Sequence, residues 1–388
     1  MIFKTIIFII VGFVTVVIAI PMILSAVGIN ILPGAGGLAQ GSELLFRSED
    51  GGEYWKPAVF VRGRRDPAPS YIYDIAAHPT ATTTLFAATR SAGLWKSEDA
   101  GATWRQVQDS SGALDPRSDI YRVVISRSRP DVMYLAVYQA GRGSVLRSTD
   151  GGASFHQIYF VGQQRYAVFD VFTPPNAPDT VMVATGEGRL LVSHDGGRYW
   201  RFSKVISDSL ARLVMHPWYS NEGYLLTDKG QVYRTYDSGE SWSDLGILGR
   251  TLRRTSSRVV EHPYNRLSFT TLRPGTSRQT LRNALVPDPH HGGVLYRTNN
   301  GSILTSVNGG SAWQPLSTFI EGLGVPVGGI AVHPREPDTL VVTAGQAVYT
   351  SHDRGITWSI TSLSSRVPLR EVYIHPEVPA ILFIATGT

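Results

Sequence analysis

The stretch GLWKSEDAGATW, at residues 93–104, decides the fold of this 388-residue sequence. It contains the pattern S/T-x-D-x-G-x-x-W, in which a hydroxyl side chain, an acid or amide, a glycine and an aromatic ring take fixed positions. Seven copies start at residues 48, 97, 148, 193, 235, 306 and 351, so successive starts are 49, 51, 45, 42, 71 and 45 residues apart. This is the spacing of four-stranded propeller blades and predicts an all-β protein.

A second signal precedes most of these boxes. Apolar runs end in His-Pro at Pro79, Pro217, Pro263, Pro334 and Pro376. An alternating run such as TLFAAT (84–89) or TLVVTA (339–344) then follows. Each unit therefore reads as an inner strand, a second strand, a third strand that enters the box, and a fourth strand after it.

The two ends of the chain complete one unit between them. The C-terminus supplies only an inner and a second strand, VYIHP and ILFIAT, whereas ELLFRSEDGGEYW near residue 43 supplies a third and a fourth. Joining them gives a seven-bladed β-propeller over residues 43–388 and hides two open sheet edges. The 71-residue interval adds an Arg-rich insertion at about 264–292, between the His-Pro at 262–263 and the strand VLYRT at 294–298.

The acid of each box has a structural explanation. Its oxygens accept backbone N–H bonds from the turn that follows, and the glycines supply positive φ. The seven positions are Asp50, Asp99, Asp150, Asp195, Asp237, Asn308 and Asp353. Asn308 favours this interpretation, because it keeps an acceptor and loses the titrating acid.

The N-terminus predicts a membrane anchor. Residues 5–29 carry no charge and are long enough to span a bilayer, whereas a signal peptide needs a shorter apolar run. Lys4 lies in a stub at residues 1–4, which places that end in the cytoplasm and the propeller in the periplasm or outside the plasma (inner) membrane. Residues 30–42 form a flexible tether. Cleavage before Gln40 would instead give a secreted form.

The composition excludes several kinds of site. The sequence has no Cys, which excludes disulfides, thiolate catalysis and Cys-ligated metals. We expect no cofactor and no metal, since the His-Pro histidines end strands and His290 and His291, beside Asp288, form an exposed loop. The net charge is +5, and 31 of the 36 basic residues are arginines.

The seven boxes resemble the BNR or Asp-box repeat proteins, which include sialidases, sortilin-type receptors, xyloglucanases and photosystem II assembly factors. The length, seven blades and His-Pro rhythm are most similar to the assembly factors. That resemblance implies an extracytoplasmic factor that holds a membrane-protein client. The apolar anchor departs from the soluble or lipid-anchored forms usual there, and nothing in the sequence points to photosynthesis.

Two groups of charged residues suggest a site. Counting back four from each His-Pro histidine, or its equivalent, gives a ring at one mouth of the central channel with largely alternating charges: Asp74, Arg122, Asp170, Arg212, Arg258 and Glu371. A purely structural salt-bridged ring is the other explanation. Residues 250–282 hold eight arginines against Glu261 alone. Those proposed to bind acidic protein or lipid headgroups are Arg250, Arg253, Arg254, Arg266, Arg273, Arg278 and Arg282.

The sequence predicts that the chain is not an enzyme. The Arg-Ile-Pro typical of sialidases is absent. Only Asp74, Asp170 and Glu371 fall in one ring, where neighbouring arginines favour ionised carboxylates. We therefore expect an interaction scaffold for a membrane protein complex, with no nucleic-acid partner and an unassigned oligomeric state. The alternative is a glycan-binding or glycoside-hydrolysing surface protein, which paired carboxylates in a cleft would favour.

Overall fold

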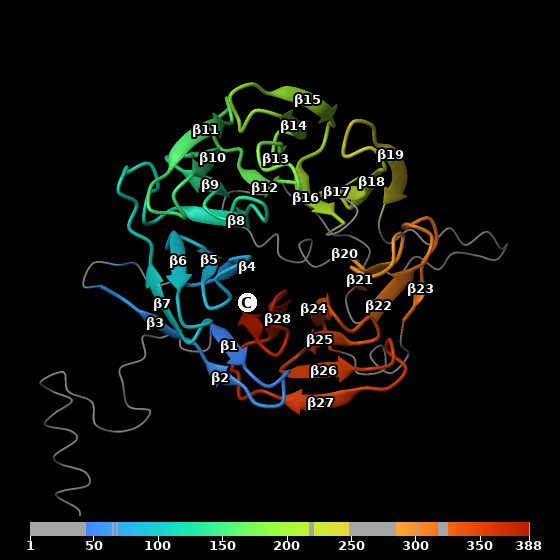
Figure 1. Cartoon of the computed structure of the whole chain (residues 1–388). Coiled ribbons are helices and arrows are strands. Elements are labelled where there is room, and N and C mark those ends of the chain that lie inside the picture. The colour runs from blue at the N-terminus through green and yellow to red at the C-terminus, as the bar shows by residue number, and fades with distance from the viewer. Residues whose placement is uncertain are drawn as a thin grey trace, which may run out of the picture. The chain divides into compact units, whose positions relative to one another are not determined.

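The described residues form seven sheets that are arranged in a ring (Figure 1). The computed structural model describes residues 44–63, 66, 69–216, 221–247, 285–299, 302–316 and 325–387. Residues 43–388 make one unit. The all-β seven-bladed propeller expected from the repeats is confirmed.

The blades are numbered here in chain order, each from its innermost strand outward. Blade 1 contains β4 (Ile72–Ala77), β5 (Leu85–Thr89), β6 (Leu94–Ser97) and β7 (Thr103–Gln106). Blade 2 contains β8 (Asp119–Ile125), β9 (Met133–Gln139), β10 (Arg142–Ser148) and β11 (His156–Phe160). Blade 3 contains β12 (Val168–Phe172), β13 (Val181–Thr185), β14 (Arg189–Ser193) and β15 (Arg201–Val205). Blade 4 contains β16 (Leu210–Met215), β17 (Gly223–Thr227), β18 (Gln231–Thr235) and β19 (Ser243–Ile247).

The remaining blades follow the same order. Blade 5 contains β20 (Val286–Pro287), β21 (Leu295–Asn299), β22 (Ser302–Ser306) and β23 (Gln314–Pro315). Blade 6 contains β24 (Val327–Val332), β25 (Leu340–Ala344), β26 (Ala347–Ser351) and β27 (Ser359–Ser362). Blade 7 contains β28 (Leu369–Ile374), β29 (Leu382–Thr386), β1 (Leu45–Ser48) and β2 (Lys56–Pro57).

Blade 7 joins the two ends of the propeller. Strand β1 pairs antiparallel with β29, from Leu45 opposite Ala385 to Ser48 opposite Leu382. The predicted closure is therefore confirmed, and no blade is left with half of its strands. Figure 1 shows β1 and β2 outward of the C-terminal strands, with blade 1 on one side and blade 6 on the other.

Blade 5 differs from the expected register. Its innermost strand is β20, whereas the expected strand ended at the His-Pro pair 262–263, which lies outside the described residues. Asp288-Pro289 occupies it instead: the Asp288 carboxylate accepts the N–H groups of His290 and His291 at 2.8 and 3.2 Å. In blade 6 the ring Nδ1 of His333 accepts the equivalent two N–H groups. A carboxylate can therefore replace the imidazole acceptor, and residues 285–292, which were expected in the insertion, lie inside blade 5.

Blade 1 has a fifth strand that the repeats did not predict. Strand β3 (Val59–Val61) runs parallel to β7 along the outer edge of this blade. Its Phe60 ring lies 5.3 Å from Trp95 and 6.1 Å from Trp104, between centroids. The fifth strand covers an edge that the β7 backbone would otherwise present to solvent.

The core lies between neighbouring blades. The second strand of each blade is buried on both faces, so alternate residues contact different neighbours. Leu85 and Ala87 pack with Phe383 of blade 7, whereas Phe86 and Ala88 pack with Leu135 of blade 2. The interfaces between blades therefore supply most of the apolar burial that stabilises the ring.

The expected anchor and insertion cannot be compared with this fold. Residues 5–29 and the arginines at 250–282 lie outside the described residues. In the part of the chain that is described, no helix is both long and apolar enough to cross a membrane.

Candidate functional site at the channel mouth

A bulge in the innermost strands places the charged residues of the channel. Strand β4 has one extra residue, Tyr73, relative to β5. Ile72 pairs with Thr89, and Asp74 pairs with the next residue of β5, Ala88. The same shift precedes Arg122, Asp170, Arg212 and Glu371 in the innermost strands of blades 2, 3, 4 and 7. A bulge re-aims side chains and is common beside functional sites. We call Asp74, Arg122, Asp170, Arg212 and Glu371 the charged collar.

Four collar residues form a continuous chain of ion pairs across blades 1 to 4. Arg122 lies between two acids, with Nη1 3.0 Å from Asp74 Oδ1 and Nε 3.4 Å from Asp170 Oδ1. Arg212 Nε lies 3.6 Å from Asp170 Oδ2. The Asp170 side chain is only 1% exposed, so solvent only weakly screens its attraction to Arg122 and Arg212.

The same carboxylates join adjacent blades through the backbone. Asp74 Oδ2 accepts the N–H of Val123 in blade 2 at 3.0 Å. Asp170 Oδ2 accepts the N–H of Leu213 in blade 4, also at 3.0 Å. Burial alone would lower the pKa of Arg122, but Asp74, Asp170 and Glu371 outweigh it and raise that pKa above its ordinary value. The collar therefore holds the charged Arg122 guanidinium in a water-poor setting.

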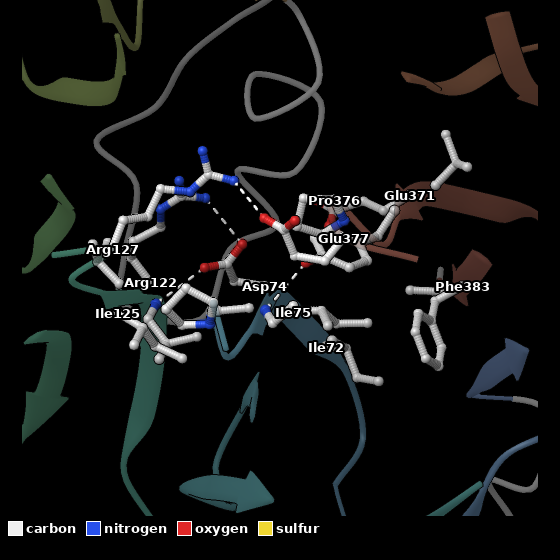
Figure 2. A pocket seen from close by; sticks show the side chains of 18 of the residues that line it. Ile72, Asp74, Ile75, Arg122, Ile125, Arg127, Glu371, Pro376, Glu377 and Phe383 are labelled. Atoms are coloured by element: carbon white, nitrogen blue, oxygen red, sulfur yellow. Dashed lines mark hydrogen bonds and ion pairs between the residues drawn. The ribbon is translucent and has the colours of Figure 1, made fainter. Parts of the chain in front are cut away.

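A pocket of about 330 Å³ opens beside the collar. Figure 2 shows Asp74, Arg122 and Glu371 on its wall, together with Arg127 and Glu377. Arg127 Nη2 lies 3.0 Å from Glu377 Oε1, which links blade 2 to the turn after β28. Ile72, Ile125 and Phe383 are among the apolar residues that line the pocket. Charged and apolar surfaces thus face one space, as in sites for small molecules and short polymer segments.

Aromatic rings form an arc beside the collar that the sequence analysis missed. The rings of Tyr71, Tyr73, Tyr121 and Phe169 follow one another at centroid separations of 5.2, 5.0 and 5.1 Å. Tyr73, Tyr121 and Phe169 are the bulged residues, each directly before a collar residue. In the sequence the only signal was an aromatic residue before the charge, in YD, YR and FD.

Of the other residues that the sequence analysis named, the arginines at 250–282 are not described, whereas His290 and His291 are. Arg258 and the other arginines proposed at 250–282 lie outside the described residues. Counting back four residues from Asp288 reaches Ala284, which is also outside them. His290 Nε2 bonds the carbonyl of His333 at 2.9 Å, and His291 Nδ1 lies 3.4 Å from Asp288 Oδ2. Within the described ranges, no three His, Asp or Glu residues are arranged to hold a metal ion.

The box acids act as hydrogen-bond acceptors in their turns. Asp150 Oδ1 accepts Ser148 Oγ at 2.7 Å and the N–H of Ser154 at 2.9 Å. Asn308 Oδ1 accepts Ser306 Oγ at 3.0 Å and the N–H of Ala312 at 2.8 Å. The hydroxyl of Ser154, its N–H group and the Ser148 hydroxyl lower the pKa of Asp150 to about 2. These carboxylates are therefore ionised turn acceptors at neutral pH.

The fold and the boxes together define a seven-bladed Asp-box propeller with a charged channel mouth. The family model for the BNR/Asp-box repeat matches residues 349–359, within the last box. Among solved structures, the fold is similar to "YCF48 bound to D1 peptide", at a TM-score of 0.57 and 15% identity, over 85% of this chain and 99% of that one. It is similar to the GH74 xyloglucanase from Xanthomonas campestris at a TM-score of 0.57 and 15% identity, over 84% of this chain and 52% of that one.

A curated relative also matches in sequence. The oligoxyloglucan-reducing end-specific xyloglucanase of Emericella nidulans is 26% identical over 355 residues, which cover 79% of this chain. The present chain spans 42% of that relative's length. This relationship contradicts the prediction that the chain is not an enzyme. That prediction depended on a missing sialidase motif and on ion-paired acids, and neither observation excludes other glycosidases.

Proposed function

We propose that this propeller acts on a glycan at the channel-mouth pocket and hydrolyses a glycosidic bond there. The observation that carries the proposal is the relationship to a xyloglucanase over 79% of the chain. The pocket adds carboxylates from two adjacent blades, Asp74 of blade 1 and Glu371 of blade 7, in one space. The substrate class we favour is a β-linked glucan of the xyloglucan kind.

The proposal gives the two carboxyl groups different roles. Glycoside hydrolysis needs one ionised carboxylate and one carboxylic acid on either side of the scissile bond. Asp74 pairs with Arg122 and accepts the N–H of Val123, so we assign it the role of base or nucleophile. The proposal needs Glu371 in its protonated form when the glycan is bound, so that it can protonate the leaving oxygen.

The experiment compares hydrolysis by matched variants. The purified full chain is incubated with xyloglucan and its oligosaccharides, and new reducing ends are measured. We expect Asp74→Asn and Glu371→Gln each to lower the rate by about 10²-fold or more, because acid–base groups contribute at that level. Glu53→Gln, an exposed carboxyl of the first box, should leave the rate unchanged. A wild-type chain that neither cleaves nor binds these glucans would refute the proposal.

A second candidate is the binding of a protein segment at the same mouth. The solved structure titled "YCF48 bound to D1 peptide" is covered over 99% of its length, so a single propeller matches its whole chain. In this candidate the propeller lies outside the plasma membrane, anchored by residues 5–29, and serves a membrane protein complex or anionic lipid. Pull-down from detergent-solubilised membranes tests it. Serine at Arg266, Arg273, Arg278 and Arg282 should weaken recovery of the client, and unchanged recovery would remove those arginines from the contact.

A further inference from the structure

Arg297 occupies a position that is part of the apolar core in every other blade. It lies on β21, two residues after Leu295, which pairs with the box serine Ser306. The equivalent residues, each two positions after the partner of a box Ser or Thr, are Ala87, Leu135, Val183, Leu225, Val342 and Ile384. All six are apolar and 0% exposed. Blade 5 alone places a guanidinium in this layer.

The surroundings of Arg297 do not neutralise its charge. The residue is 6% exposed, and its guanidinium carbon lies 4.8 Å from the centroid of the Trp313 ring. Its Nε is buried without a hydrogen-bond partner, and among the described residues no carboxylate lies within ion-pair distance of it. Trp313 in turn packs against Leu295, Leu226 and Val214, at the interface of blades 4 and 5.

Comparison with Arg122 shows that Arg297 has no carboxylate partner among the described residues. Arg122 is half-buried, and its two aspartates outweigh the effect of burial and raise its pKa, whereas Arg297 is buried and burial alone lowers its pKa. A buried charge is costly unless it is paired, and a ring face compensates only part of that cost. Leucine or valine at this position, as in other blades, would avoid the cost altogether.

We propose that Arg297 is the anchor of a binding site for a small oxyanion, of the carboxylate or phosphate type, between blades 4 and 5. The planar guanidinium donates from adjacent nitrogens and matches the two oxygens of such a group. The bound anion neutralises the charge and stabilises this interface. The site lies away from the channel-mouth pocket and does not depend on the proposed hydrolysis.

The test measures thermal unfolding of the full chain while sodium acetate or sodium phosphate replaces sodium chloride at constant ionic strength. Wild type should show a saturable rise in Tm, about 4 °C when the anion is a hundredfold above its dissociation constant. Arg297→Leu should lose this response and should melt higher than wild type without the anion. Arg105→Leu, an exposed arginine of blade 1, should keep the wild-type response.

Each outcome decides the proposal. A rise with acetate alone assigns a carboxylate site, a rise with phosphate alone assigns a phosphate site, and a rise with both assigns a general oxyanion site. Equal responses of wild type and Arg297→Leu, or a lower Tm of Arg297→Leu in chloride, would overturn it. If that variant fails to fold, Arg297→Lys replaces it. Lysine lacks the planar, two-pronged donor group of arginine, so the anion affinity of the Arg297→Lys variant, measured by calorimetry, should be at least tenfold lower than that of wild type. Unchanged affinity would overturn the proposal.

Discussion

Asp170 is the residue on which the charged collar depends most. Its side chain is 1% exposed, lies close to Arg122 and Arg212, and accepts the N–H of Leu213. Removing it takes one of its two aspartates from Arg122 and the ion pair with Asp170 from Arg212. We expect Asp170→Ala to lower the free energy of unfolding by about 3–5 kcal/mol, measured by chemical denaturation. Asp170→Asn keeps an acceptor and should cost less, and an Asp170→Ala variant as stable as Glu53→Ala would contradict this account.

Single residues also mark the limit of what the sequence predicts. The collar positions followed from counting back from His-Pro, because that count is constant along regular strands. The bulges before Asp74 and Arg122 could not be predicted, since they depend on hydrogen-bond register between strands and not on apolar spacing. The aromatic arc depends on those bulges and was missed for the same reason. Arg297 was missed because only alignment of the seven second strands shows that its position is a core position.

In blades 1, 6 and 7 the turn after the innermost strand contains a histidine whose Nδ1 accepts backbone N–H groups, and Asp288 does the same in blade 5. His375 Nδ1 accepts the N–H groups of Glu377 and Val378 at 3.1 and 3.0 Å, so its Nε2 carries the proton and donates to the carbonyl of Thr82 at 2.9 Å. Protonation of Nδ1 would break two of these bonds. Burial lowers the pKa of His78, His216, His333 and His375 below the ordinary value. Asp288 shows that a carboxylate can serve as the acceptor, a substitution that a search for His-Pro cannot find.

This element predicts a pH dependence with a definite sign. Because the folded-state pKa of these histidines is lowered, the unfolded chain binds more protons below pH about 6.5. The free energy of unfolding should reach its maximum above that pH. It should fall as the pH drops through the pKa values that these histidines have in the folded chain. The box carboxylates, with Asp150 at a pKa of about 2, contribute only at lower pH. Denaturation at pH 7.5 and 5.5 measures the effect; His375→Gln should reduce it, and equal stability at the two pH values would contradict it.

Closure of blade 7 gives a second prediction for an element. Deleting residues 372–388 removes β29 and leaves β1 and β2 without their partner strand. We expect aggregation or a large loss of thermal stability, because two sheet edges become exposed. Phe60→Ala is the matched control, since β3 lies outside the four-stranded pattern and its loss leaves the ring closed. A truncated chain that melts at the wild-type temperature would contradict the closure.

At the scale of the whole molecule, the fold was predictable and the activity was not. Seven boxes at blade spacing specify a propeller because each repeat buries its apolar strands only against its neighbours. The chemistry depends instead on which charges meet in one pocket, and that follows from the register of the innermost strands. Absence of a sialidase motif was therefore a poor guide, and the relationship to a xyloglucanase reversed the prediction that had depended on it.

The position of a bound glucan tests the central claim most directly. A crystal structure of the Glu371→Gln variant with a xyloglucan oligosaccharide should place a sugar in the 330 Å³ pocket. Its hydroxyl groups should lie within hydrogen-bond distance of Asp74 and Arg122. An oligosaccharide bound elsewhere on the propeller, with this pocket empty, would contradict the account.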